Sequence, residues 1–143
     1  MDEERKAPEE RTLINNDYCF VCGRNNPIGL HTTWSFEDGG IARSRFEPHS
    51  HHQGWQGVLH GGILATLLDE AMAQRLRFSD IFAVTATISV RYRRPAPTAG
   101  VLIVEGMLVS EKSRTIQCRA RVRGEDGLLY AEAEGTCVRM RRP

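Results

Sequence analysis

The chain lacks several features that would place it in a specialised class of protein. No apolar stretch approaches the roughly 20 residues that a membrane-spanning helix needs, and the acidic start Met1-Asp2-Glu3-Glu4 is unlike a secretory signal peptide. Its 19 basic and 18 acidic residues leave a net charge of +1, without the basic excess typical of nucleic-acid-binding domains. Four cysteines in 143 residues are too few for a disulfide scaffold. We therefore expect a cytoplasmic protein that binds neither nucleic acid nor membranes.

The remaining composition is that of an ordinary globular domain. Hydrophobic residues make up 41% of the chain and charged residues 26%, and 143 residues are enough to bury one core but not two. Residues 1–12 are charged and show no apolar periodicity, which predicts a flexible N-terminal arm. Residues 13–143 are expected to form a single domain.

The segment from Val58 to Gln74 carries the strongest local signal. His60-Gly61-Gly62 is typical of a turn and helix start, and the helix is predicted to continue to about Phe78. At about 100° per residue, one broad stripe contains most of its apolar side chains: Ile63, Leu64, Leu67, Leu68, Ala71 and Met72. Asp69 and Glu70 interrupt this surface, so we expect both acids to be buried. Asp69 projects from a flank of small residues that a ligand or second subunit can approach closely, and Glu70 lies about 100° further round.

The rest of the chain predicts strands. Residues 30–36 and 41–46 are expected to form a hairpin through 37–40, and alternation of apolar and polar residues begins at Ala83 and ends before Pro95. Three more strands are predicted over 101–110, 115–123 and 128–140. We interpret the last four strands as an antiparallel meander. The expected class is α+β, a curved antiparallel sheet wrapped around one long central helix.

Cys19 and Cys22 form a C-x-x-C pair, which is typical of half a zinc site or of a redox pair. No second C-x-x-C or H-x-x-x-H follows, although His31 or the group His49, His51 and His52 offers further ligands. Structural packing is the favoured interpretation, and no metal site is predicted. Cys118 and Cys137 lie in strand-like runs and are expected to be buried.

Four pieces in order carry a family resemblance over nearly the whole chain. They are Cys19-Phe20-Val21-Cys22-Gly23 with Asn26-Pro27-Ile28-Gly29-Leu30; His52-Gln53-Gly54 with Gly57-Val58-Leu59-His60-Gly61-Gly62; Asp69; and Thr85-Ala86 leading to Tyr92-Arg93-Arg94-Pro95. With these pieces the chain resembles the hotdog-fold acyl-CoA thioesterases of the phenylacetic-acid-degradation (PaaI-like) group.

The resemblance implies hydrolysis of an acyl-CoA thioester to a carboxylic acid and free CoA, without metal or organic cofactor. Asp69 matches the family's acid, as nucleophile or as general base for water. The backbone N–H at Gly61 polarises the thioester carbonyl, which suits a helix N-terminus. Thr85 orients the water or the carboxylate, and His60 positions groups or contacts substrate. Gly62, Arg93 and Arg94 are assigned to substrate binding, the arginines through the CoA phosphates.

Helix geometry adds an expectation about assembly. Nine residues separate His60 from Asp69, which corresponds to roughly 13.5 Å of rise and two and a half turns. One chain cannot bring both to one thioester, so a homodimer with shared active sites is the minimal enzyme. The resemblance implies the same arrangement, with further pairing into tetramers.

Other interpretations of the same residues remain open. Asp69 can pair with an arginine at an interface, Gly61 and Gly62 can serve only a tight helix entry, and Arg93 and Arg94 can form a solvated strand end. One alternative function is a hotdog dehydratase or hydratase acting on acyl-carrier-protein or CoA substrates, with Glu70 as its acid. A second is a non-catalytic acyl-CoA-binding dimer. The identity of the acyl group is not indicated.

Overall fold

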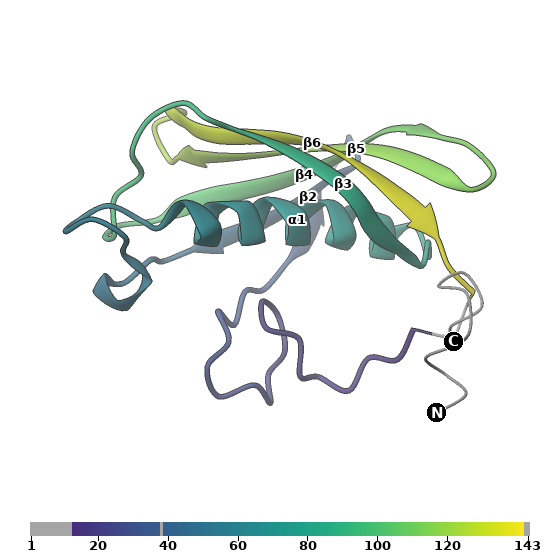
Figure 1. Cartoon of the computed structure of the whole chain (residues 1–143), viewed down its shortest axis with the longest axis horizontal. Coiled ribbons are helices and arrows are strands. Elements are labelled where there is room, and N and C mark those ends of the chain that lie inside the picture. Colours follow the sequence, from purple (N-terminus) through teal and green to yellow (C-terminus); the bar gives the residue numbers. More distant parts are fainter. Residues whose placement is uncertain (1–12, 38, 142–143) are drawn as a thin grey trace.

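One long helix lies against the concave side of a six-stranded sheet (Figure 1). The computed structural model describes residues 13–37 and 39–141, so the arm predicted over 1–12 lies outside the described residues. The elements are β1 (Ser35–Glu37), β2 (Ile41–Phe46), a 3-10 turn η3 (Ser50–His52), α1 (Gly61–Phe78), β3 (Ala83–Tyr92), β4 (Leu102–Glu111), β5 (Thr115–Gly124) and β6 (Leu129–Arg139). The predicted architecture is confirmed. No helix in the described ranges is long and apolar enough to cross a membrane.

The apolar stripe seats α1 on the sheet. Its buried side chains include Leu64, Leu67, Leu68, Ala71, Met72 and Leu76. Close approach depends on glycine in the facing strand, because a Cβ at Gly106 of β4 would lie 2.0 Å from the Ala71 carbonyl oxygen. Packing at this density fixes the position of the helix along the sheet, and with it the positions of the residues on its other flank.

The two helix acids are half-buried rather than buried, which corrects the expectation from the sequence. Asp69 lies on the predicted flank of small residues with Ala65 and Ala73, and these neighbours are half-buried as well. In a single chain this flank is only partly covered. The apolar stripe lies on the other side of the helix and therefore cannot bury the carboxylate.

The strand order corrects the predicted meander. The order is β1-β2-β4-β5-β6-β3, with every neighbouring pair antiparallel, so β3 pairs with β6 and not with β4. The connection from β3 to β4 contains Pro95 and Pro97, which do not suit a tight hairpin, and the chain crosses past β6 and β5 so that β4 lies between β2 and β5. Strand β3 is thus an edge strand, and Val84 and Ile88 on it are each 38% exposed.

The first predicted strand is shorter than expected. Only Ser35–Glu37 pairs with β2, whereas residues 30–32 bond to the N-terminal loop. The N–H of Leu30 donates to the Phe20 carbonyl at 2.9 Å, and the N–H of Thr32 donates to the Val21 carbonyl at 2.9 Å. These bonds compete with sheet pairing, and His31 between them has a φ of 53°, outside the extended region.

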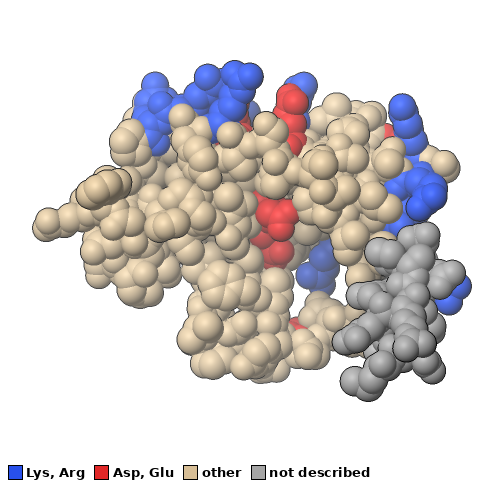
Figure 2. Space-filling view, in the orientation of Figure 1, with Lys and Arg blue, Asp and Glu red and all other residues tan. Residues whose placement is uncertain are grey.

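Glu105 of β4 is completely buried on the outer side of the sheet, under a cover of arginines. Its carboxylate accepts hydrogen bonds from Nε of Arg43 at 2.9 Å, of Arg121 at 2.8 Å and of Arg123 at 2.8 Å. Figure 2 shows Lys and Arg side chains gathered on the side of the molecule where the strands lie. The pattern of the sequence did not indicate this buried acid.

We expect this cluster to make stability depend on acidic pH. Burial alone would raise the pKa of Glu105, but hydrogen bonds from Arg123, Arg121 and Arg43 outweigh it and hold the pKa at about 2, below the ordinary 4.5. Stabilisation by the carboxylate is therefore present above pH 4.5 and is lost as the pH falls through about 2. The loss is expected to be about 3 kcal/mol in the free energy of unfolding.

Urea unfolding of the wild type and of Glu105→Gln over this pH range checks the expectation. The stability difference between the two proteins should shrink as the pH falls, because a protonated glutamate resembles glutamine. A difference that stays constant from neutral pH to pH 2 would show that the ionised carboxylate contributes nothing.

Candidate active site

The start of α1 leaves one backbone donor free. Nδ1 of His60 accepts a hydrogen bond from the Gly62 N–H at 2.8 Å, so Nδ1 carries no proton. The His60 carbonyl accepts from the N–H of Ile63 at 2.9 Å and of Leu64 at 3.2 Å. Within the described ranges, no group accepts from the Gly61 N–H. The Gly61 N–H is thus available to a ligand at the positive end of the helix dipole.

Tyr92, the last residue of β3, packs against Gly61. Its hydroxyl donates to the Gly61 carbonyl at 2.9 Å, and a Cβ at Gly61 would lie 3.4 Å from the tyrosine ring. Tyr92 lies in one of the motifs that carry the family resemblance, but no role was predicted for it. The only signal was its place beside Arg93 and Arg94, since its partner lies 31 positions away in the chain.

A cavity of about 850 Å³ opens in front of this helix start. It brings together the predicted residues His60, Gly61, Arg93 and Arg94, and it is also lined by Trp55, which is 84% exposed. The remaining lining is largely apolar: Gly54, Val58, Leu59, Leu64, Tyr92, Pro95 and Ala96. An apolar cavity beside a free N–H suits an acyl group whose carbonyl oxygen needs a donor.

The groups predicted to bind substrate differ in whether their charge or N–H is already engaged within the chain. Arg93 pairs with the Glu132 carboxylate at 2.6 Å, whereas Arg94 donates to the neutral carbonyl of Leu129. The Gly62 N–H is already bonded to His60. Arg94 therefore retains the least compensated positive charge of the two arginines.

Asp69 is held by Thr85. The hydroxyl of Thr85 donates to Oδ1 of Asp69 at 2.7 Å, so this oxygen is fixed while Oδ2 has no hydrogen-bond partner in the described ranges. The resemblance implied that Thr85 orients the water or the carboxylate, and this hydrogen bond is the contact that such a role requires. The β3–β6 register shifts between Thr85 and Thr87, so that Thr85 pairs with the buried Cys137 and turns toward the helix. A bulge beside a reactive group is a common way to re-aim a side chain.

The two groups of candidate residues stay apart in one chain. Gly61 and Asp69 lie eight residues apart on the same helix, which corresponds to about 12 Å of rise. The cavity at the helix start is lined by neither Asp69 nor Thr85. Each chain thus carries two candidate half-sites, one at Gly61 and one at Asp69.

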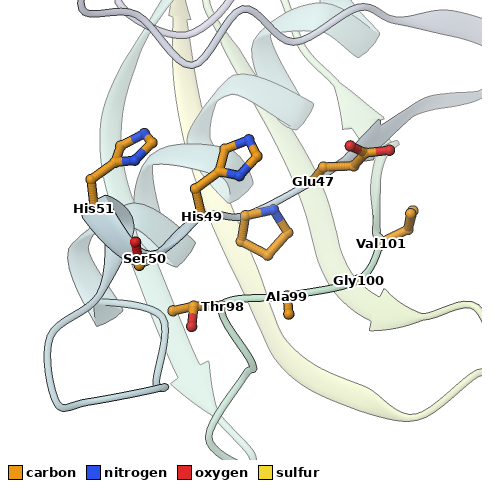
Figure 3. Close-up of a pocket in the computed structure, with 9 residues that line it drawn as sticks. Glu47, His49, Ser50, His51, Thr98, Ala99, Gly100 and Val101 are labelled. Atoms are coloured by element: carbon orange, nitrogen blue, oxygen red, sulfur yellow. The ribbon is translucent and has the colours of Figure 1, made fainter.

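The histidine loop forms a separate concavity. Figure 3 shows His49 and His51 there with Glu47 and Thr98, along a hollow of about 680 Å³ that includes none of the candidate catalytic residues. The rings of His51 and His52 lie 4.2 Å apart, and burial together with His51 and His49 lowers the pKa of His52. In the described ranges, the group that suits a metal ion is instead Cys19, Cys22 and Glu70.

The curved sheet around one helix, with a free N–H at the helix start, defines a hotdog-fold protein. The chain belongs to the thioesterase superfamily, whose family model matches residues 56–131. It is 30% identical over 89 residues to the acyl-coenzyme A thioesterase THEM4 of Bos taurus, an overlap that covers 62% of this chain and 36% of that protein. The chain therefore spans well under half the length of this relative.

Solved structures share the fold. A crystal structure of a thioesterase superfamily protein has a TM-score of 0.82 at 26% identity, covering 96% of this chain and 71% of that chain. A hypothetical thioesterase of Streptococcus pneumoniae, solved with coenzyme A, has a TM-score of 0.72 at 19% identity, over 78% and 88% of the two chains. The PaaI protein of E. coli, from the phenylacetic acid degradation operon, has a TM-score of 0.72 at 19% identity, over 77% and 84%.

Proposed function

We propose that the protein is an acyl-CoA thioesterase, which hydrolyses the thioester to a carboxylic acid and free CoA. The observation that carries the proposal is the free Gly61 N–H at the start of α1, beside an apolar cavity and on the same helix as a carboxylate held by a hydroxyl. The curated relative that the chain resembles is named for the same activity.

The Gly61 N–H would bind the carbonyl oxygen of the thioester. As the carbonyl is attacked, negative charge gathers on this oxygen, and a fixed donor at a helix N-terminus stabilises it. His60 supports this arrangement by accepting hydrogen bonds from the other N–H groups of the first turn. Its Nδ1 accepts from the Gly62 N–H, and its carbonyl accepts from the N–H groups of Ile63 and Leu64. Its role is that of a helix cap that leaves the Gly61 N–H as the donor for substrate.

Asp69 would supply the other half of the chemistry. As general base, it takes a proton from water, the hydroxide adds to the carbonyl carbon, and collapse expels the CoA thiolate, which receives the proton. As nucleophile, it forms a mixed anhydride with release of the thiolate, and water then cleaves the anhydride. In either route, the Thr85 hydroxyl on Oδ1 leaves Oδ2 to act.

A dimer would unite the half-sites. The separation along α1 requires Gly61 of one chain to work with Asp69 and Thr85 of another. Strand β3 supports this, because it is an edge strand with exposed apolar side chains, including Val84, Ile88 and Tyr92. Uncovered edges of this kind are suited to pairing with another strand. Further association into tetramers stays a prediction.

The CoA part of the substrate would lie near Arg94. This side chain lines the cavity at Gly61, and its bonded partner is a neutral carbonyl, so its charge remains available to a phosphate. Arg93 is the weaker candidate because Glu132 neutralises it. The CoA bound in the Streptococcus pneumoniae structure supports this class of substrate.

A thiol-release screen across aryl, short, medium and long acyl-CoA substrates tests the proposal. We expect measurable release from at least one class. Absence of release from every substrate, by a folded dimer that still binds CoA, would leave the non-catalytic binding function. The dehydratase alternative gains no support from the geometry, since Oε2 of Glu70 already accepts hydrogen bonds from Gln74 and Cys19.

The Thr85 hydroxyl offers a graded test of the Asp69 half-site. Thr85→Ala should lower kcat by about 10-fold, because it removes one hydrogen bond to the reacting carboxylate. Thr85→Ser keeps the hydroxyl and should retain most of the activity. Steady-state thiol release from both variants provides the measurement, and equal losses would indicate that Thr85 acts only through packing.

A further inference from the structure

Two cysteines and a glutamate from distant parts of the chain meet beneath the helix. The ligand atoms of Cys19, Cys22 and Glu70 all lie within 4.8 Å of one another, and Sγ of Cys19 is 3.8 Å from Oε2 of Glu70. Zinc binds sulfur at about 2.3 Å and carboxylate oxygen at about 2.1 Å, so tetrahedral ligands of one ion lie roughly 3.5 to 3.8 Å apart. The observed spacing needs only a small contraction to hold such an ion.

The loop that carries the cysteines is shaped around the sulfur atoms. Sγ of Cys19 accepts from the N–H of Val21 at 3.4 Å and of Cys22 at 3.5 Å. The next residue closes the turn, since the Gly23 N–H donates to the Cys19 carbonyl at 2.9 Å. A Cβ at Gly23 would lie 2.3 Å from the Cys19 nitrogen, so only glycine fits. The loop thus holds the two cysteine side chains in a tight turn, close enough together to share one ion.

The cluster has no basic partner of its own. The neutral side chain of Gln74 donates a hydrogen bond to the Glu70 carboxylate at 3.0 Å. In the described ranges, no ion pair involves Glu70. All three residues are half-buried. A bound cation would supply the positive charge that no paired side chain provides.

We propose that Cys19, Cys22 and Glu70 bind a zinc ion that ties the N-terminal loop to α1. Two thiolates favour zinc over magnesium or calcium, which prefer oxygen ligands. With three protein ligands, the fourth position faces a cavity of about 390 Å³ lined by all three residues and by Tyr18, Ala73 and Arg77. Water fills this position in three-ligand zinc sites.

The ion would position the N-terminal loop against α1 and would take no part in cleaving the thioester. The N-terminal loop lies on the side of α1 away from the sheet (Figure 1), and Glu70 is the residue next to Asp69. Bonds from the ion to both cysteines and to Glu70 would therefore hold residues 19–22 against α1, beside Asp69. The site stands apart from the proposed hydrolysis, and its test can fail or succeed independently of thiol release.

The first test uses the wild-type full-length chain, purified with its thiols reduced. Elemental analysis after zinc loading should give one ion per chain. Substitution by Co²⁺ should give the thiolate-to-metal charge-transfer band and the visible bands of a tetrahedral site. This spectrum requires no variant, so a folding failure cannot obscure it. Absence of zinc and cobalt binding by the reduced protein would overturn the proposal, as would a Cys19–Cys22 disulfide that persists under reductant.

Variants then locate the ion. Cys22→Ser and Glu70→Gln should each weaken zinc binding by at least about 100-fold in a chelator competition. Cys118→Ala is the matched control, since it removes a buried cysteine outside the cluster and should leave zinc affinity unchanged. Undiminished binding in Cys22→Ser would overturn the proposal and place the ion elsewhere, with the histidine loop as the next candidate.

Discussion

Asp69→Asn is expected to lower kcat for thioester hydrolysis by about 10³-fold, the effect of removing a general base or nucleophile. The asparagine side chain has nearly the same size and can still accept the hydrogen bond from Thr85. It cannot take a proton from water or attack the carbonyl carbon. Substrate binding should change little, because the loss concerns the reaction step, so KM is expected to stay within a few-fold of wild type.

Asp126→Asn is the matched control for this experiment. Asp126 lies in the turn between β5 and β6, is exposed, and accepts a hydrogen bond from the Leu128 N–H at 3.0 Å. The same change of charge there should leave kcat unaltered. Glu70→Gln is compared as well and should retain at least 100-fold more activity than Asp69→Asn. The reverse order would favour the dehydratase interpretation, in which Glu70 is the reacting acid.

Gly61→Pro is expected to lower kcat by about 10² to 10³-fold, because proline has no N–H and the oxyanion loses its donor. The substitution suits this position structurally. Gly61 is the first residue of α1, where proline is well tolerated, and His60 before it already has a φ of −59° and a ψ of 133°. Helix content and thermal stability should therefore remain close to wild type while activity falls.

Gly61→Ala distinguishes the loss of the N–H donor from crowding by an added side chain. Alanine keeps the N–H, and its Cβ would lie 3.4 Å from the Tyr92 ring, an ordinary contact. We expect a loss of less than about 10-fold for this variant. If alanine and proline reduced kcat equally, the crowding at Tyr92 would explain the effect and the Gly61 N–H would have no part in it.

The sequence predicted those features that depend on local periodicity. The apolar stripe placed the helix and the face that it buries, and it put Asp69 on the flank of small residues where the structure has it. Alternation located β3 to β6 to within a residue or two. It did not predict that β3 pairs with β6, because the long connection with Pro95 and Pro97 sets no partner.

The features missed by the sequence depend on contacts between distant residues. The bulge that turns Thr85 toward Asp69 is a matter of register with β6 and leaves no mark on the pattern of β3. Glu70 meets Cys19 across 51 positions. The spacing of cysteines and histidines along the chain therefore gives no indication that this carboxylate lies beside them. Glu105 likewise has apolar neighbours along β4, and the arginines that bind it lie on β2 and β5.

We propose that each active site combines the Gly61 half-site of one chain with the Asp69 half-site of another. Mixed dimers of Asp69→Asn and Gly61→Pro chains test it most directly. About half of randomly assorted dimers are mixed, and each mixed dimer would hold one intact site of two, so the mixture should recover about a quarter of wild-type activity. If both half-sites acted within one chain, every site would carry one defect, and the mixture would be no more active than the average of its parents.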